Sequence, residues 1–369
     1  MTDVDVIVTR AFIEKANLLV KEENKMKRRE FLGTLAVAGA TLAAGRAIAG
    51  HGVQYGGKPV KRSVEDKPVV LEVAINGSTT KAKNKNVPVT PQEIGAEAIR
   101  CLDAGATIIH AHSGKPSENI EAAAQVYIDA FKPVREKHPY GILYPTANFN
   151  AQTNNKSRSV WPGKIQSGHY RAIAEAGLAN MILLDTGVSP MAAYDEKGLP
   201  GPANKFFWYG FWPDDINIAH DVCTELGTGA SISVFEPCWM KNVVAMAHKG
   251  TLPRGSKLNI YFADYDFTGC APPIPEALEM YLHMIEGIDV NWAVGMLGKN
   301  IMETPLARMA LERGGSFRVG IEDWGSGPSN VEQIAMAKEL INKVGRPIVN
   351  GPEAIKYLDI PFAATRSKA

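Results

Sequence analysis

Short strand-like runs alternate with longer helical stretches along most of the chain, and this alternation restricts the fold more than any other feature. The runs are rich in β-branched or aromatic residues, as buried strands are. The eight strand candidates span residues 69–75, 107–112, 141–146, 180–185, 230–235, 257–262, 290–295 and 316–321. Helical stretches follow each of them, near residues 91–105, 118–137, 165–177, 213–226, 237–249, 275–286, 303–313 and 330–344.

The alternation predicts parallel strands joined by crossover helices. Eight such units predict a single-domain (β/α)8 TIM barrel over residues 69–369. The spacing leaves extended loops after the third and fourth strands, at residues 147–164 and 186–212. An open doubly wound sheet is the alternative, and it has less support because no GxGxxG motif follows the first strand candidate.

The first helical stretch, residues 91–105, carries its own start and stop signals. Thr90 is predicted as the N-cap, with Glu93 placed to complete a capping box. Gly105 is predicted to end the helix.

The N-terminal segment is predicted to lie outside the barrel. Residues 26–49 begin with three basic residues (Lys27–Arg29), continue through an apolar stretch and end in a small-residue pattern. This order is typical of an export signal, and the paired arginines favour the twin-arginine type. Residues 1–25 are interpreted as an upstream over-call of the start, expected to be disordered, and residues 50–68 as an N-terminal extension.

The signal predicts that the mature chain is periplasmic, without a stable membrane anchor. An uncut anchor is the alternative, but the apolar stretch is short for a membrane span and Arg46 interrupts it. A cytoplasmic location is the second alternative.

Composition narrows the expected partners. The formal net charge of +1 gives no electrostatic reason to expect nucleic acid. The cysteines form no CxxC pair and are predicted to be buried apolar side chains. They are Cys101, Cys223, Cys238 and Cys270.

Two histidines close the second strand candidate and indicate a metal site. His110 and His112 are two residues apart, so both side chains point to one side of a strand. Glu322 follows the eighth strand, which in a closed barrel lies two strand spacings from the second, on the order of 10 Å. Side chains at the carboxyl ends of these strands could bind one ion. Zinc is expected, because a catalytic zinc takes three protein ligands and keeps an open position.

These ligand types do not identify the metal, because two histidines and a glutamate also bind manganese, iron or cobalt. Amidohydrolases form another class of zinc barrel, with HxH after the first strand and more histidines after strands five and six. Here those strands end in SVFEPC and YFADYD, which contain no histidine. That class is therefore a minor alternative.

Other charged residues near strand ends are candidates for acid–base chemistry. Arg318 is predicted to share the inward face of the eighth strand with Glu322 and to need a carboxylate partner. Asp323, beside the metal ligand, and Glu236, at the end of the fifth strand, are candidate bases. Solvated carboxylates lining the mouth are the interpretation of Asp185, Asp264 and Asp266.

Several segments resemble the β-keto acid cleavage enzymes, whose type member is the 3-keto-5-aminohexanoate cleavage enzyme. The segments are AINGSTTK, VPVTPQEIGAEA, GATIIHAH, WAVGMLG, RGGSFRVGIEDW and GRPIVNGPEA. The resemblance runs over most of residues 69–358. The combination of HxH with RxGxED makes it specific.

The resemblance implies a barrel that binds zinc and forms oligomers, commonly homotetramers. It implies an exchange between a β-keto acid and acetyl-CoA that releases acetoacetate and a new acyl-CoA. The implied roles are metal ligation by His110, His112 and Glu322, catalysis by Arg318 and Asp323, and substrate contact by Asn76, Thr146 and Asn148. The family has a Ser-Thr pair where this chain has Pro145-Thr146.

Export and acetyl-CoA are in conflict, because acetyl-CoA is a cytoplasmic metabolite. The leading hypothesis is a metal-dependent C–C bond enzyme that acts on a keto acid. A zinc-dependent hydrolase or lyase that works without CoA is the second hypothesis. An exported small-molecule-binding protein on a barrel scaffold is the third.

Overall fold

A computed structural model describes residues 64–114, 117, 119–148, 166–201, 207–265 and 267–361 of the chain. The predicted signal at 26–49, the segment 1–25 and most of the extension 50–68 lie outside the described residues. So do Asp266 and most of the predicted loop 147–164.

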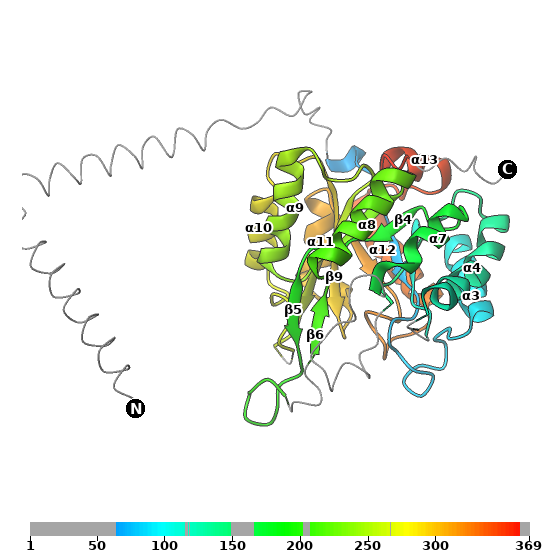
Figure 1. Cartoon of the computed structure of the whole chain (residues 1–369). Coiled ribbons are helices and arrows are strands. Elements are labelled where there is room, and N and C mark those ends of the chain that lie inside the picture. Colours follow the sequence, from blue (N-terminus) through cyan, green and yellow to red (C-terminus); the bar gives the residue numbers. More distant parts are fainter. Residues whose placement is uncertain are drawn as a thin grey trace, which may run out of the picture. The chain divides into compact units, whose positions relative to one another are not determined.

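Eight parallel strands form one sheet in the order β3-β2-β1-β10-β9-β8-β7-β4 (Figure 1). They are β1 (Glu72–Ala74), β2 (Ile108–Ala111), β3 (Ile142–Pro145), β4 (Met181–Leu183), β7 (Gly229–Val234), β8 (Lys257–Ala263), β9 (Asn291–Leu297) and β10 (Ser316–Val319). The N–H of Asn180, the residue before β4, donates to the carbonyl of Leu143 in β3 at 3.1 Å. The sheet is thus a nearly closed barrel, and the predicted single-domain (β/α)8 fold is confirmed.

Helices follow the strands and pack around the sheet (Figure 1). They are α3 (Pro91–Asp103), α4 (Ile120–Lys137), α7 (His169–Glu175), α8 (Pro213–Leu226), α9 (Pro237–Lys249), α10 (Pro275–Met284), α11 (Pro305–Glu312), α12 (Asn330–Val344) and α13 (Gly351–Tyr357), with short 3-10 helices η1 (Val64–Asp66) and η3 (Ile301–Glu303). The capping box of Thr90 and Glu93 is present, as predicted. Neither α13 nor the two 3-10 helices were expected from the sequence.

The two sides of the barrel strands differ in chemistry. Apolar side chains such as Val73, Ile109 and Val294 are buried in the hydrophobic core. Glu72 and Lys257 are also fully buried, and they form an ion pair with each other inside the barrel. The barrel interior therefore contains a buried ion pair.

The predicted loop 186–212 contains an antiparallel hairpin of β5 (Val188–Met191) and β6 (Phe207–Gly210). The backbone crosses closely at Gly210, which has a φ of +131°, and a Cβ there would lie 1.9 Å from the carbonyl oxygen of Gly187. Only glycine fits such an approach. The hairpin brings Tyr209 against Trp239 of α9, with ring centroids 6.4 Å apart.

The prediction that all four cysteines are buried is wrong. Cys101 and Cys223 are buried, but Cys238 is exposed and Cys270 only partly covered. Cys238 lies in the first turn of α9, where the neighbouring Trp239 and Met240 take the positions that face the core.

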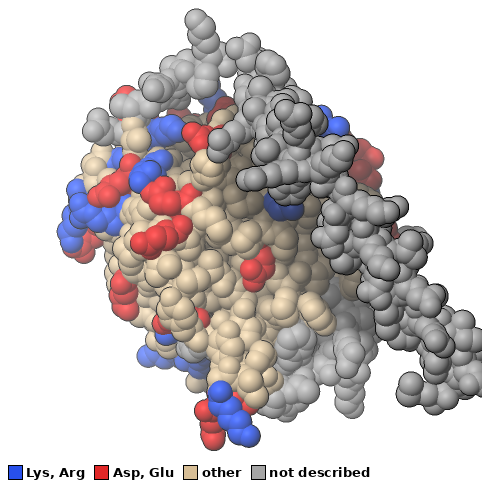
Figure 2. Space-filling model, turned by 90° about the vertical axis from the view of Figure 1, so that its left-hand side faces the viewer, with Lys and Arg blue, Asp and Glu red and all other residues tan. Residues whose placement is uncertain are grey.

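Figure 2 shows the side of the molecule where α9 and α10 lie in Figure 1. Acidic and basic side chains gather mainly toward its margins, and between them lies a wide, mostly uncharged area that contains an acidic side chain. Within the described ranges, every helix is too short or too polar to cross a membrane.

Candidate metal centre

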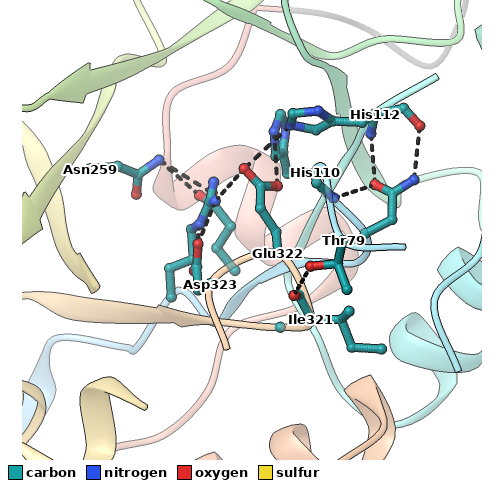
Figure 3. Close-up of polar contacts among 12 residues, drawn as sticks. Thr79, His110, His112, Asn259, Ile321, Glu322 and Asp323 are labelled. Atoms are coloured by element: carbon teal, nitrogen blue, oxygen red, sulfur yellow. Dashed lines mark hydrogen bonds and ion pairs between the residues drawn. The ribbon is translucent and has the colours of Figure 1, made fainter. Parts of the chain in front are cut away.

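Three side chains converge at the carboxyl end of the barrel (Figure 3). His110 belongs to β2, His112 follows that strand, and Glu322 lies in the turn after β10. Nε2 of His110 lies 3.4 Å from Oε2 of Glu322, and Nε2 of His112 lies 3.3 Å from Oε1. Potential ligand atoms of all three lie within 4.8 Å of one another. The three predicted metal ligands therefore lie close together, as expected from the sequence.

These spacings fit a shared ion better than direct hydrogen bonds. Two ligands bound to one tetrahedral zinc are about 3.3 Å apart, from metal–ligand bonds of about 2.0–2.1 Å. In the described part of the chain, His112 Nε2 and Glu322 Oε2 are buried atoms without a hydrogen-bond partner. Buried polar atoms of this kind call for a ligand, and the donor set suits a divalent metal.

The protonation states also favour metal binding, since metal ligands must be deprotonated. Burial lowers the pKa of His110 to about 3, so its imidazole is neutral. Burial raises the pKa of Glu322, but Arg318 and the two histidines outweigh that effect and hold it well below its usual range. Glu322 is therefore a carboxylate.

The turn that carries Glu322 differs from the expected strand. β10 ends at Val319, and the backbone leaves it at Gly320 with a φ of +135°. A Cβ at Gly320 would lie 2.1 Å from the carbonyl oxygen of Ala74, so this close crossing requires glycine. The N–H of Glu322 then donates to the same Ala74 carbonyl at 3.1 Å. Arg318 and Glu322 meet because of this turn, and not through strand alternation as predicted.

Asn76 and Gly77, which follow β1, hold the triad from the other side. The Asn76 side chain donates to the carbonyl of His112 at 2.9 Å and accepts from the N–H of His112 at 2.8 Å. It also accepts a hydrogen bond from the N–H of Gly77 and donates one to the carbonyl of Pro88. All of these partners are backbone groups, so Asn76 fixes His112; its predicted contact with substrate stays a prediction.

Arg318 joins the candidate metal ligand to Asp323. Its guanidinium donates to both carboxylate oxygens of Asp323, at 2.8 and 2.7 Å, and lies 3.0 Å from Oε1 of Glu322. Burial raises the pKa of Asp323 to about 6, although Arg318 acts in the opposite direction. The expected arginine–carboxylate pair is present, and it is buried.

A second ion pair lies deeper in the barrel and was not anticipated. Glu72 accepts hydrogen bonds from Lys257 at 2.8 Å and from the Tyr144 hydroxyl at 2.6 Å. Its Oε1 also lies 3.4 Å from Nη1 of Arg318 and accepts a hydrogen bond from the side-chain amide of Asn259. No sequence motif identifies Glu72, which is a single polar residue in an otherwise apolar strand. Its role as an ion-pair partner is seen only in the structure, where it contacts Lys257 across the barrel.

Four carboxylates and two basic side chains lie at the centre of the described barrel. The carboxylates are Glu72, Asp185, Glu322 and Asp323, and the bases are Lys257 and Arg318. Burial raises the pKa of Asp185 and of Asp323 to about 6, so the net charge of this group depends on pH. The excess of carboxylates over bases is compatible with a bound divalent cation.

The other predicted site residues lie around the same end of the barrel. Thr146 and Asn148 follow β3 and are buried, and Asn148 accepts from the N–H of Ser117 at 2.9 Å. Glu236 is the N-cap of α9, after β7, and its carboxylate accepts from the N–H of Cys270 at 3.2 Å. Burial raises its pKa. Their roles in binding or catalysis stay predictions.

The solvated interpretation holds for one mouth carboxylate and fails for another. Asp264 is half-exposed and paired with Lys299. Asp185 is 0% exposed, because its side chain points into the barrel instead of toward solvent.

The fold and the triad define a (β/α)8-barrel protein with a candidate divalent-metal site at the catalytic end of the barrel. Residues 68–360 match the family model described as beta-keto acid cleavage enzyme. The chain belongs to that family.

Curated relatives agree with this membership. The chain is 23% identical over 304 residues to a 3-oxoadipate:acetyl-CoA acetyltransferase of Cupriavidus necator, which covers 80% of this chain and 96% of the relative. It is 22% identical to a 3,5-dioxohexanoate:acetyl-CoA acetone transferase of Paraburkholderia graminis, covering 81% and 97%. It is 24% identical to a 3-keto-5-aminohexanoate cleavage enzyme of Acetoanaerobium sticklandii, covering 80% and 99%.

Among solved structures, the apo form of ObcA matches with a TM-score of 0.52 and 14% identity. The match covers 75% of this chain and 66% of ObcA. It supports the fold alone.

Proposed function

We propose that this protein is a zinc-dependent β-keto acid cleavage enzyme that exchanges acyl groups between a β-keto acid and acetyl-CoA. The observation that carries the proposal is the contact between the triad and the Arg318–Asp323 pair. A metal-binding carboxylate and a buried potential base share one guanidinium. The bond between C2 and C3 of the keto acid would break, and its carboxymethyl group would bond to the acetyl group of acetyl-CoA to form acetoacetate. The remaining acyl group of the keto acid would form the new thioester with CoA.

The chemistry needs an activated ketone and a group that moves a proton. A divalent ion held by His110, His112 and Glu322 would polarise the ketone and orient the substrate oxygens. Asp323 is the base in this proposal, because Arg318 fixes both of its oxygens and its carboxylate lies beside the candidate metal ligand. Thr146 and Asn148, after β3, are proposed to contact the substrate.

The names of two relatives support acetyl-CoA as the second substrate. The Cupriavidus and Paraburkholderia proteins are both named for transfer involving acetyl-CoA and an oxo acid. Each of them is covered almost end to end by the match, so the shared region contains their catalytic domain.

Isotope labelling tests the proposed exchange. Zinc-loaded full-length protein is incubated with 3-oxohexanoate and acetyl-CoA that carries carbon-13 in both acetyl carbons. The proposal expects acetoacetate with two labelled carbons and unlabelled butanoyl-CoA. Absence of acetoacetate across a broad panel of β-keto acids would contradict it.

A CoA-independent reaction is the second candidate, and the N-terminal sequence favours it. We propose that residues 26–49 act as a twin-arginine export signal and that the mature chain is periplasmic. A zinc-dependent hydrolase or lyase would suit that location, because it needs no cytoplasmic cosubstrate. Products that form equally well without acetyl-CoA would favour this candidate. Full-length protein that remains in the cytoplasmic fraction would exclude export.

We also propose a homo-oligomer. The mostly uncharged area in Figure 2 lies where α9 and α10 cover the barrel, and α10 exposes 40% of Met280. Light scattering would decide the state: a mass above one chain supports the proposal, and a monomer at micromolar concentration contradicts it.

A further inference from the structure

Asp185 points into the barrel at the carboxyl end of β4. Leu183 pairs in register with Ser231 of β7, and the Ser231 hydroxyl accepts from Asn259 in the buried interior. β4 ends at Leu183, and Asp185, two residues further on, lies beside Ser233. Ser233 shares the inner face of β7 with Ser231, because residues two apart on a strand share a face. Thr186 points the other way, and its hydroxyl donates to the carbonyl of Trp239 on α9.

This position faces the candidate metal centre across the mouth. In the ring of eight strands, β4 is four steps from β10, which makes the two strands opposite each other. Arg318 of β10 lowers the pKa of Asp185, so the two groups are within electrostatic reach.

A row of aromatic rings connects the two sides. We call Tyr209, Phe235 and Tyr261 the mouth row. Tyr209 meets Phe235 edge-on at 5.2 Å, and Phe235 stacks on Tyr261 at 4.6 Å between centroids. Cζ of Arg318 lies 5.1 Å from the centroid of Tyr261. The row thus runs from beside Asp185 to the arginine next to the triad.

The Asp185 carboxyl has no charged partner of its own in the described structure. It is 0% exposed, and neither oxygen has a hydrogen bond of good geometry. The hydroxyls of Ser233 and Tyr209 are close enough to lower its pKa, yet burial dominates and raises it to about 6. A buried carboxylate without a cation is destabilising, and such groups concentrate at functional sites.

We infer that Asp185 is a specificity-determining residue that excludes β-keto acids with a second carboxylate at the far end. A substrate oriented at the triad would extend its tail along the mouth row toward Asp185. Aromatic faces suit an uncharged carbon chain, while a negative charge near Asp185 meets repulsion in a poorly screened interior. The inference rests on the proposed function, because it assumes that a β-keto acid binds at the triad.

The inference sets this chain apart from one of its relatives. The Cupriavidus protein is named for 3-oxoadipate, a keto acid with carboxylates at both ends. The structure assigns to the present chain a monocarboxylic keto acid with an uncharged tail.

A matched pair of substrates tests the inference. 3-Oxohexanoate and 3-oxoadipate have the same chain length and differ only in a terminal methyl or carboxylate. Zinc-loaded full-length protein is assayed at pH 8, where Asp185 is ionised, for kcat/KM with acetyl-CoA and for Kd by calorimetry without it. The wild type should prefer 3-oxohexanoate by at least about tenfold in both measurements.

Two isosteric variants locate the source of that preference. Asp185→Asn removes the buried charge and should reduce the preference by about tenfold. Asp264→Asn removes a carboxylate at the same end of the barrel that is half-exposed and paired with Lys299, and it should leave the preference unchanged.

The outcomes separate this inference from the proposed function. Equal handling of the two acids by the wild type would overturn the role of Asp185 and leave the exchange reaction standing. An unchanged preference in Asp185→Asn would do the same. Failure of both acids to bind would overturn the proposed function together with this inference. The preference of the wild type for 3-oxohexanoate is measured without any variant. The inference can therefore be contradicted even if Asp185→Asn folds poorly.

Discussion

The Arg318 guanidinium holds Asp323 by two hydrogen bonds, from Nε to Oδ2 at 2.8 Å and from Nη2 to Oδ1 at 2.7 Å. The same Nη2 lies 3.0 Å from Oε1 of Glu322. One cation therefore sets the position of both the potential base and the candidate metal ligand.

Asp323→Asn separates the two roles. The amide keeps the shape of the side chain and leaves Glu322 untouched, but it is not a base. We expect zinc content close to wild type and kcat lower by at least about 100-fold, the usual range for loss of a general base. Zinc analysis and steady-state kinetics check this. A kcat within threefold of wild type would remove Asp323 from the mechanism.

Gly77→Ala should weaken metal binding without touching a ligand. A Cβ at this position would lie 2.3 Å from Cγ of Glu322, and the φ of +56° is unfavourable for alanine. Glu322 must therefore move, and we expect zinc affinity to fall by about tenfold or more in a chelator competition.

Gly287→Ala is the matched control for that variant. Gly287 has a φ of +80° and open space around it, so alanine there brings similar backbone strain without displacing Glu322. Its zinc affinity should equal that of the wild type. If the two variants lost affinity alike, backbone strain and not the displaced ligand would be the cause.

The barrel and the triad could be predicted from the sequence because both follow local patterns. Strand candidates alternate with capped helices, and the helices at 213–226, 237–249 and 330–344 match the observed bounds. His110 and His112 share a face by simple strand alternation. Barrel closure then brings Glu322 to them, because β1 is the only strand between β2 and β10.

Features that depend on distant pairing could not be predicted in this way. Glu72 and Lys257 are 185 positions apart, and nothing local marks either as charged and buried. The turn at Gly320 depends on a close approach to Ala74 of another strand. The sequence alone predicts a solvated Asp185, because nothing local indicates which way a carboxylate at a strand end points.

The buried pair of Glu72 and Lys257 should show strong coupling. Removal of either partner leaves the other charge buried, so Glu72→Gln and Lys257→Met should each lower the free energy of unfolding by about 3–5 kcal/mol. The double variant should be less destabilised than the sum, as measured by urea denaturation. The exposed pair Lys343–Glu339 is the control, with an expected cost below about 1 kcal/mol. Single-variant costs as small as the control's would contradict the pairing.

Asp185 should make stability depend on pH in a defined direction. Burial raises its pKa from 3.8 to about 6, so the folded state binds this proton more tightly than the unfolded state. Its contribution to stability therefore falls as pH rises from about 4 to about 6 and stays low above that. Asp185→Asn should be more stable than wild type by about 2–3 kcal/mol at pH 8, with the difference vanishing near pH 4. Urea denaturation at both pH values checks this, and a variant less stable at pH 8 would contradict it.

The central claim is that the triad holds the ion on which turnover depends. The most direct measurement compares wild type with Glu322→Gln for zinc affinity, zinc content and acetoacetate formation from 3-oxohexanoate and acetyl-CoA. The account predicts about one zinc per wild-type chain, a zinc affinity at least about tenfold lower in the variant, and loss of acetoacetate in parallel. A Glu322→Gln protein that binds zinc and forms acetoacetate as the wild type does would contradict the account.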